Sequence, residues 1–72
     1  MTPVHPGLTD RQEEVILLIG EGLGLGEIAE LLGISRWTAK DHRDNAIRRL
    51  NATSQSHAVA IVVRHRLLEV PA

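Results

Sequence analysis

A tight turn between two short helical segments constrains the fold of this chain more than any other feature. Residues 25–50 read LGEIAELLGISRWTAKDHRDNAIRRL. Within them, Gly33 suits the left-handed position that ends a helix, and Ser35 is a good N-cap for the next helix. We therefore expect helices over about 25–32 and 36–50, joined by a tight turn. Two helices joined in this way are a means of placing the second helix in the major groove of DNA.

Two further helices are predicted on either side of this pair. Thr9 is a good N-cap with a glutamine three residues later, as in a capping box, which predicts a helix over about 9–20. A buried strand over the apolar run 15–19 is the lesser alternative. The second helix is expected to start poorly because Gly24 offers no side-chain cap, and a fourth helix is expected over about 55–68. The chain is therefore predicted to be all-α.

The length of 72 residues is enough for one domain with a marginal core. Residues 1–7 contain two prolines and a glycine, so we expect a flexible N-terminal arm there and one helix-turn-helix domain over 8–72. There is no cysteine, and the single tryptophan is accompanied by no phenylalanine or tyrosine, so the core must be aliphatic. The first residues do not resemble a signal peptide and no apolar run is long enough to span a bilayer, which predicts a cytoplasmic protein with no membrane contact.

The small net charge of −1 conceals a strong segregation of charge along the chain. Residues 1–32 carry one basic and six acidic side chains, whereas residues 33–66 carry seven basic and two acidic ones. A basic half suits binding to a polyanion while the acidic half faces away from it. The alternative is chance, since helices tend to be acidic near their start and basic near their end.

A helical wheel of about 100° per residue divides the helix over 36–50, which should end at Asn51, into an inner and an outer face. The inner face, which must contact the core, carries Ala39, His42, Ala46 and Leu50. The outer face and its flanks carry the residues that we predict to contact double-stranded DNA: Arg36, Trp37, Thr38, Lys40, Asp41, Arg43, Asp44 and Arg48.

A helix in a groove meets base edges with the centre of its outer face, which we call the crest, and phosphates with the two flanks of that face. The crest consists of Trp37, Lys40, Asp41, Asp44 and Arg48, and the flanks carry Arg36 and Arg43 on one side and Thr38 on the other. The flanking arginines and threonine therefore suit phosphates, and the lysine and arginine of the crest suit guanine. The two aspartates could accept a hydrogen bond from cytosine N4, and the tryptophan could press on a thymine methyl group or a sugar. The alternative is a solvated face with an Asp44–Arg48 ion pair. The aspartates also repel phosphate and so weaken non-specific binding.

Several spaced elements of the sequence together resemble the LuxR-type, or GerE-like, DNA-binding domain. They are Leu8-Thr9-x-Arg11-Gln12-x-Glu14-Val15, Gly22-Leu23, Glu27-Ile28-Ala29, Leu32-Gly33-Ile34-Ser35, Thr38-x-Lys40-x-His42 and Leu50. The resemblance covers residues 8–68, and the short length is similar to that of free-standing members of the family. It implies a four-helix helix-turn-helix fold of the LuxR/NarL effector type, with a dimer contact through the fourth helix, and transcription regulation in a bacterium or a phage.

By position, the resemblance implies groove contacts by Lys40, Asp41 and Asp44. The chain departs from the family pattern at Gly26, Asp44 and Gln55, where basic residues are common in the family, and each departure lowers the positive charge. The alternative function is therefore a protein-interaction module of the same fold, which inhibits a full-length regulator by forming a heterodimer with it.

The predicted fourth helix has two adjacent apolar stripes. One stripe consists of Ala58, Ile61, Val62, His65 and Leu68. The other, which we predict to form the interface of a homodimer, consists of Val59, Val63, Leu67 and Val70. A two-fold dimer through this helix would place two reading helices about one DNA turn apart. The alternative is that the first helix covers both stripes.

Catalytic and metal-binding chemistry is not expected. The four histidines do not share a ligand spacing, and no cysteine supports them, so we predict no metal and no cofactor. The serines have no base beside them in an evident triad. The run GLGLG at 22–26 lacks the lysine and hydroxyl residue of a phosphate-binding loop, so the chain is not expected to be an enzyme.

Overall fold

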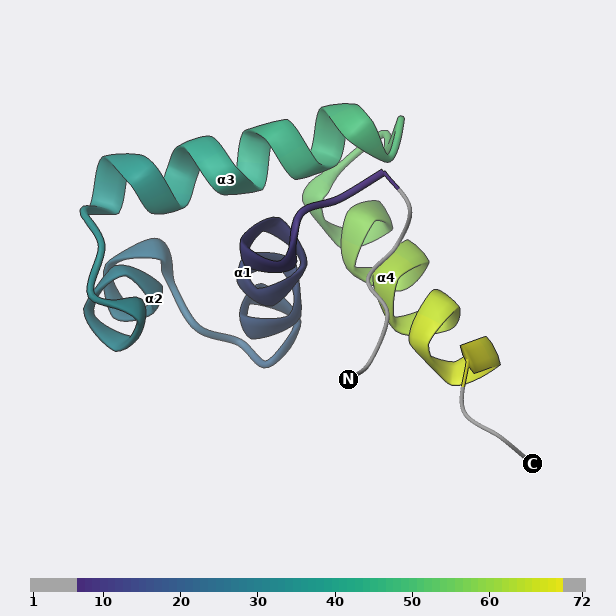
Figure 1. Ribbon diagram of the computed structural model, residues 1–72, viewed down its shortest axis with the longest axis horizontal. Coiled ribbons are helices and arrows are strands. Elements are labelled where there is room, and N and C mark those ends of the chain that lie inside the picture. The colour runs from purple at the N-terminus through teal and green to yellow at the C-terminus, as the bar shows by residue number, and fades with distance from the viewer. Residues whose placement is uncertain (1–6, 70–72) are drawn as a thin grey trace.

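The computed structural model describes residues 7–69, which form four helices (Figure 1). They are α1 (Asp10–Gly20), α2 (Leu25–Leu32), α3 (Arg36–Arg49) and α4 (Gln55–Glu69). Each helix begins and ends within one residue of its predicted bounds, and α1 occupies the run for which a strand was the alternative. No strand forms between residues 7 and 69, and the all-α prediction is confirmed. Of the predicted arm, only Gly7 lies within the described residues.

Local capping signals set the helix boundaries. The backbone N–H of Gln12 donates to Thr9 Oγ1 at 3.1 Å and the N–H of Thr9 donates to Gln12 Oε1 at 3.1 Å, which completes the predicted capping box. Ser35 Oγ accepts from the N–H of Thr38 at 2.9 Å and so caps α3. Gly33 (φ 69°) and Asn51 (φ 55°) are both left-handed, as the sequence predicts for the residues that follow α2 and α3.

The start of α2 is better stabilised than the sequence suggested. Gly24 has no side chain to cap the helix, but its own N–H donates to Glu27 Oε1 at 2.9 Å. The carboxylate of Glu27 thus supplies one half of a capping box from within the first turn, where its charge also suits the positive end of the helix dipole. The prediction of a poor start overlooked this contribution.

The aliphatic core consists of two clusters on either side of α1. The cluster that α1 shares with α3 and α4 contains the buried residues Leu8, Ile16, Ala46, Ala58 and Val62. The cluster that α1 shares with α2 and α3 contains Val15, Ile28, Ala29 and Ala39. Because the adjacent residues Val15 and Ile16 enter different clusters, α1 is the central helix on which the other three pack.

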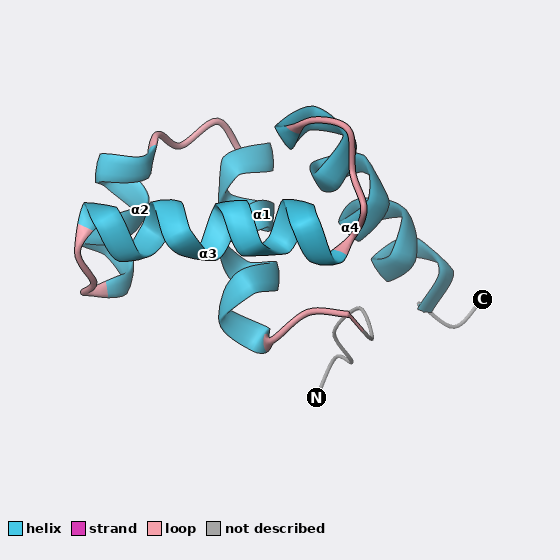
Figure 2. Ribbon diagram, turned by 90° about the horizontal axis from the view of Figure 1, so that it is seen from above, coloured by secondary structure: helices cyan, strands magenta, loops and turns pink. Residues whose placement is uncertain are grey.

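The arrangement of the helices leaves one side of α3 uncovered. α3 lies across α1, with α2 packed near its beginning and α4 near its end (Figure 1). α2 and α4 do not contact each other. Viewed from above, α3 is the outermost element, and no other described segment crosses it (Figure 2). The side of α3 that faces away from α1 is therefore accessible along its length.

Candidate nucleic-acid interface

α3 contacts the core through small side chains and presents its charged side to solvent. Ala39 and Ala46 are fully buried, whereas His42 and Leu50 of the predicted inner face are half-buried. Most of the predicted DNA contacts are exposed, namely Arg36, Trp37, Lys40, Asp41 and Arg48. The others, Thr38, Arg43 and Asp44, are half-buried. Helical periodicity therefore placed both fully buried residues of α3 on the inner face, but it missed Ile47, which is partly buried against the core.

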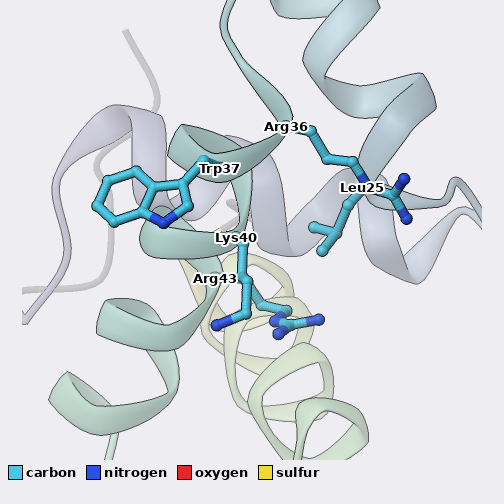
Figure 3. A pocket seen from close by; sticks show the side chains of 5 residues that line it. All are labelled: Leu25, Arg36, Trp37, Lys40 and Arg43. Atoms are coloured by element: carbon cyan, nitrogen blue, oxygen red, sulfur yellow. The ribbon is translucent and has the colours of Figure 1, made fainter.

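The first turns of α3 and the start of α2 enclose a shallow pocket of about 520 Å³ (Figure 3). Its lining consists of Leu25, Arg36, Trp37, Lys40 and Arg43. The Lys40 and Arg43 side chains extend in the same direction, while the indole of Trp37, 73% exposed, points away from them (Figure 3). The pocket thus combines three cationic groups with apolar surface, a composition that suits a sugar-phosphate backbone.

Leu25 is the one residue of this lining that was not predicted from the sequence to contact DNA. It lies on α2, directly after the glycine that precedes the helix, and a helical wheel drawn for α3 alone could not reveal it. Its proximity to α3 follows from the tight turn at 33–35, which brings the two helices together.

A single carboxylate, that of Asp44, binds two of the predicted DNA-contacting cations. Asp44 Oδ2 accepts from Lys40 Nζ at 2.8 Å, and Asp44 Oδ1 lies 3.0 Å from both Nε and Nη2 of Arg43. The alternative Asp44–Arg48 pair does not form among the described residues, because the carboxylate turns toward the preceding helical turn. The hydrogen bond from Lys40, and after it that from Arg43, lowers the pKa of Asp44, although partial desolvation opposes this.

Two other predicted contact residues also have partners within α3 or at its cap. Asp41 Oδ2 accepts from Asn45 Nδ2 at 3.3 Å, so the carboxylate of Asp41 is paired with a neutral amide. The hydroxyl of Thr38 accepts from Ser35 Oγ at 2.8 Å. Thr38 therefore strengthens the cap of α3 in addition to lying on the flank of the predicted interface.

α4 leaves apolar side chains uncovered. Ala58 and Val62 of the first predicted stripe are fully buried, but Leu68 of the same stripe is 77% exposed, so that stripe docks only over its first turns. In the second stripe, Val63 and Leu67 are 40% and 69% exposed. Val59 is half-buried against the core, and Val70 lies outside the described residues. The alternative that α1 covers both stripes is wrong for the last turns of α4.

Other kinds of site were also sought in residues 7–69. Nowhere in this range do three or more histidine, aspartate or glutamate side chains come together in a group that could hold a metal ion. None of the four helices combines the length and the apolar character that crossing a membrane would require.

Comparison with known proteins identifies the family. Residues 6–62 match the family of bacterial regulatory proteins described as the luxR family. Transcriptional activator protein BjaR1 of Bradyrhizobium diazoefficiens is 41% identical over 61 residues, which are 85% of this chain and 25% of that protein. Transcriptional activator protein CarR of Pectobacterium carotovorum is 33% identical over 64 residues, 89% of this chain and 26% of that protein.

A third relative is named a response regulator rather than a transcriptional activator. Response regulator protein VraR of Staphylococcus aureus is 34% identical over 62 residues, which are 86% of this chain and 30% of that protein. The chain thus spans between about a quarter and a third of the length of these relatives. With its four helices and the tight turn between α2 and α3, the chain belongs to the luxR family of bacterial regulatory proteins and has the family's helix-turn-helix fold.

Proposed function

We propose that this chain is a sequence-specific DNA-binding regulator of transcription that places α3 in the major groove. The observation that carries the proposal is the uncovered outer side of α3, which bears the basic residues while the inner side contacts the core with alanines. A helix held in this way can enter a groove about 12 Å wide without displacing any other element. The luxR-family membership and the transcriptional activators among the relatives support the same function.

The contacts divide by their position on α3. Arg36 and Arg43 lie on a flank and suit phosphates, and the Leu25 side chain beside them offers apolar contact to a sugar. Lys40 and Arg48 lie on the crest, from which long cationic side chains reach guanine O6 and N7. The carboxylates of the crest suit cytosine N4, so the groove face is built to distinguish bases rather than only to neutralise phosphates.

A homodimer through α4 is the proposed assembly. Val63, Leu67 and Leu68 are exposed on the last turns of α4, which extend beyond the body of the domain (Figure 1). Burying these three aliphatic side chains against a second copy would remove them from water at a gain of roughly 25 cal/mol per Å² of apolar surface. A two-fold axis there would direct two copies of α3 toward one face of a DNA duplex, in the bacterial cytoplasm where the chromosome lies.

Selection of bound sequences from a random duplex pool tests the proposal directly. We expect enrichment of an inverted repeat whose half-sites are about 10 base pairs apart from centre to centre. Enrichment of a single half-site would support base reading by α3 and contradict the dimer. Recovery of no preferred sequence from a protein shown to be folded would contradict the function itself.

A second candidate function is an inhibitory interaction module that pairs through α4 with a full-length regulator of the same family. The observation in its favour is the Asp44 carboxylate, which pairs with two cations of the DNA-facing helix and cancels one of their two charges. Titration of random duplex DNA at low salt separates the two functions. Binding with a micromolar or lower Kd supports the DNA-binding regulator, whereas the absence of binding together with heterodimer formation supports the module.

A further inference from the structure

Both oxygens of the Asp44 carboxylate are occupied, each by a different cation. Oδ2 is bonded to Lys40 Nζ at 2.8 Å, and Oδ1 is bonded to Arg43 Nε and Nη2, each at 3.0 Å. These are charge-assisted hydrogen bonds, which are about twice as strong as neutral ones. The single negative charge of Asp44 is therefore shared by Lys40 and Arg43 in the protein without DNA, and the three groups together retain one net positive charge.

We infer that Asp44 discriminates against non-specific DNA by holding Lys40 and Arg43 away from the phosphates, an inference that rests on the proposed DNA-binding function. Non-specific affinity comes almost entirely from cations that neutralise phosphates and release counterions. A cation that remains on Asp44 releases none. For either cation to reach a phosphate on an arbitrary sequence, its bond to Asp44 must break, and the carboxylate is then left facing a polyanion.

A specific site reduces the free-energy cost of separating Asp44 from Lys40 and Arg43. Where the sequence presents a cytosine within reach, its N4 amine donates to the carboxylate of Asp44 in place of the two cations. Lys40 is then available for guanine and Arg43 for a phosphate on the flank. The hydrogen bond from cytosine N4 thus offsets part of the cost of separating Asp44 from its cations, an offset that other sequences do not provide.

Asp41 provides an internal comparison on the same helix. It also lies on the outer side of α3, one turn before Asp44, and it carries the same charge, although Asp41 is exposed and Asp44 is half-buried. Its carboxylate, however, is bonded to the neutral amide of Asn45 at 3.3 Å. Removing the charge of Asp41 therefore changes the electrostatic potential at the DNA-facing surface without releasing a cation.

The experiment compares the isosteric variants Asp44→Asn and Asp41→Asn. The measurement is the affinity for a random-sequence duplex over a series of salt concentrations, together with the affinity for the selected operator. We expect Asp44→Asn to steepen the slope of log K against log salt by roughly one unit, because the three groups gain one net positive charge, and Asp41→Asn to leave the slope nearly unchanged. We also expect Asp44→Asn to lower the ratio of operator to random-duplex affinity by roughly tenfold, since the random duplex gains a positive charge while the operator keeps only a neutral amide oxygen as the acceptor for cytosine N4.

A third variant tests whether Asp44 acts through the cations. In Lys40→Gln/Asp44→Asn only the charge of Arg43 remains, so the three positions carry the same net charge as in the wild type and the slope should return to near the wild-type value. Circular dichroism and thermal unfolding establish that each variant is folded, which is expected because Lys40, Asp41 and Asp44 all lie on the outer side of α3.

The possible failures are distinguishable. If the wild type binds random duplex and the two single variants change the slope equally, the role of Asp44 is wrong and the proposed function stands. If no variant binds duplex DNA even at low salt, the proposed function is wrong, and the role of Asp44 is overturned with it, because released Lys40 and Arg43 should restore binding.

Discussion

Glu13 of α1 and Arg66 of α4 form an ion pair that joins the first helix to the last. Glu13 Oε1 lies 2.9 Å from Arg66 Nη2 and accepts a hydrogen bond from Arg66 Nε at 3.1 Å, across 53 positions of the chain. The Glu13 side chain is only 1% exposed, and its second oxygen has no hydrogen-bond partner among the described residues. The compensation of this buried charge therefore depends on Arg66.

Replacing Arg66 should destabilise the domain. Arg66→Met keeps the aliphatic part of the side chain but leaves the Glu13 carboxylate buried without a counter-charge. Breaking a buried pair typically costs 3–5 kcal/mol, and because the Arg66 side chain is 37% exposed we expect a loss of about 2–4 kcal/mol. Urea unfolding gives the free energy of unfolding of both proteins. Arg64→Met, at an exposed position of the same helix, should change it by less than about 0.5 kcal/mol.

The last residue of α1 is a glycine because α4 passes close to it. A Cβ at position 20 would lie 2.8 Å from Cγ1 of Val59, so Gly20→Ala forces α1 and α4 apart or moves the valine, at a cost of about 1–3 kcal/mol. Adding Val59→Ala should recover part of the loss, as measured by urea unfolding. Gly26→Ala is the matched control, because nothing lies within 4 Å of its Cβ position. There we expect a gain of up to about 1 kcal/mol from helix propensity.

Loss of Lys40 should depend on the DNA sequence. We expect Lys40→Ala to weaken binding to the selected operator by about 1–3 kcal/mol and binding to random duplex by less, since Lys40 shares the charge of Asp44 in the free protein. Arg36→Ala, on the exposed flank, should instead weaken binding to all sequences and flatten the salt slope by about one unit. Electrophoretic mobility shifts over a salt series measure both effects. A uniform effect of Lys40→Ala would remove it from the base-reading set.

The proposed dimer interface can be tested with one charge on α4. Leu67 is 69% exposed, and Leu67→Glu places a carboxylate at the centre of the proposed contact, which should abolish the two-to-one complex with the selected duplex. Sedimentation measures this stoichiometry. The control is Leu31→Glu on α2, because Leu31 is similarly exposed, at 63%, and lies outside α4. If both variants form two-to-one complexes, α4 is not the dimer contact.

The ion pairs of Asp44 predict a small effect of pH on stability. Because the hydrogen bonds from Lys40 and Arg43 lower the pKa of Asp44, they stabilise the folded state above the ordinary value of 3.8, and this stabilisation is lost as the pH falls through the lowered value. The Asp44 side chain is 37% exposed, so the contribution is roughly a few tenths of a kcal/mol. The free energy of unfolding of wild type minus that of Asp44→Asn should therefore be constant near neutral pH and decrease below about pH 3.8.

Local interactions explain why the helix boundaries could be predicted from the sequence. The caps at Thr9 and Ser35 and the left-handed Gly33 and Asn51 each act within four residues, so the sequence around them is sufficient. The inner and outer faces of α3 follow from helical periodicity for the same reason.

The interactions that the sequence did not reveal are those in which several partners compete or distant segments meet. Asp44 has Lys40, Arg43 and Arg48 all within one turn, and sequence spacing cannot decide among them. The pairing of Glu13 with Arg66 depends on how α1 and α4 pack, which no local pattern records. The exposure of Leu68 likewise depends on where α4 leaves the body of the domain.

The fully buried residues of α3 are both alanines, Ala39 and Ala46, and Ile47 packs against the core beside them. Methyl groups allow α3 to lie close to α1, and the large charged side chains on the outer side of the helix take no part in the core. Substitutions on the outward side therefore cost the scaffold little. Proteins built in this way can change the DNA sequence that they recognise through substitutions on the outer side of α3, while the four-helix fold is kept.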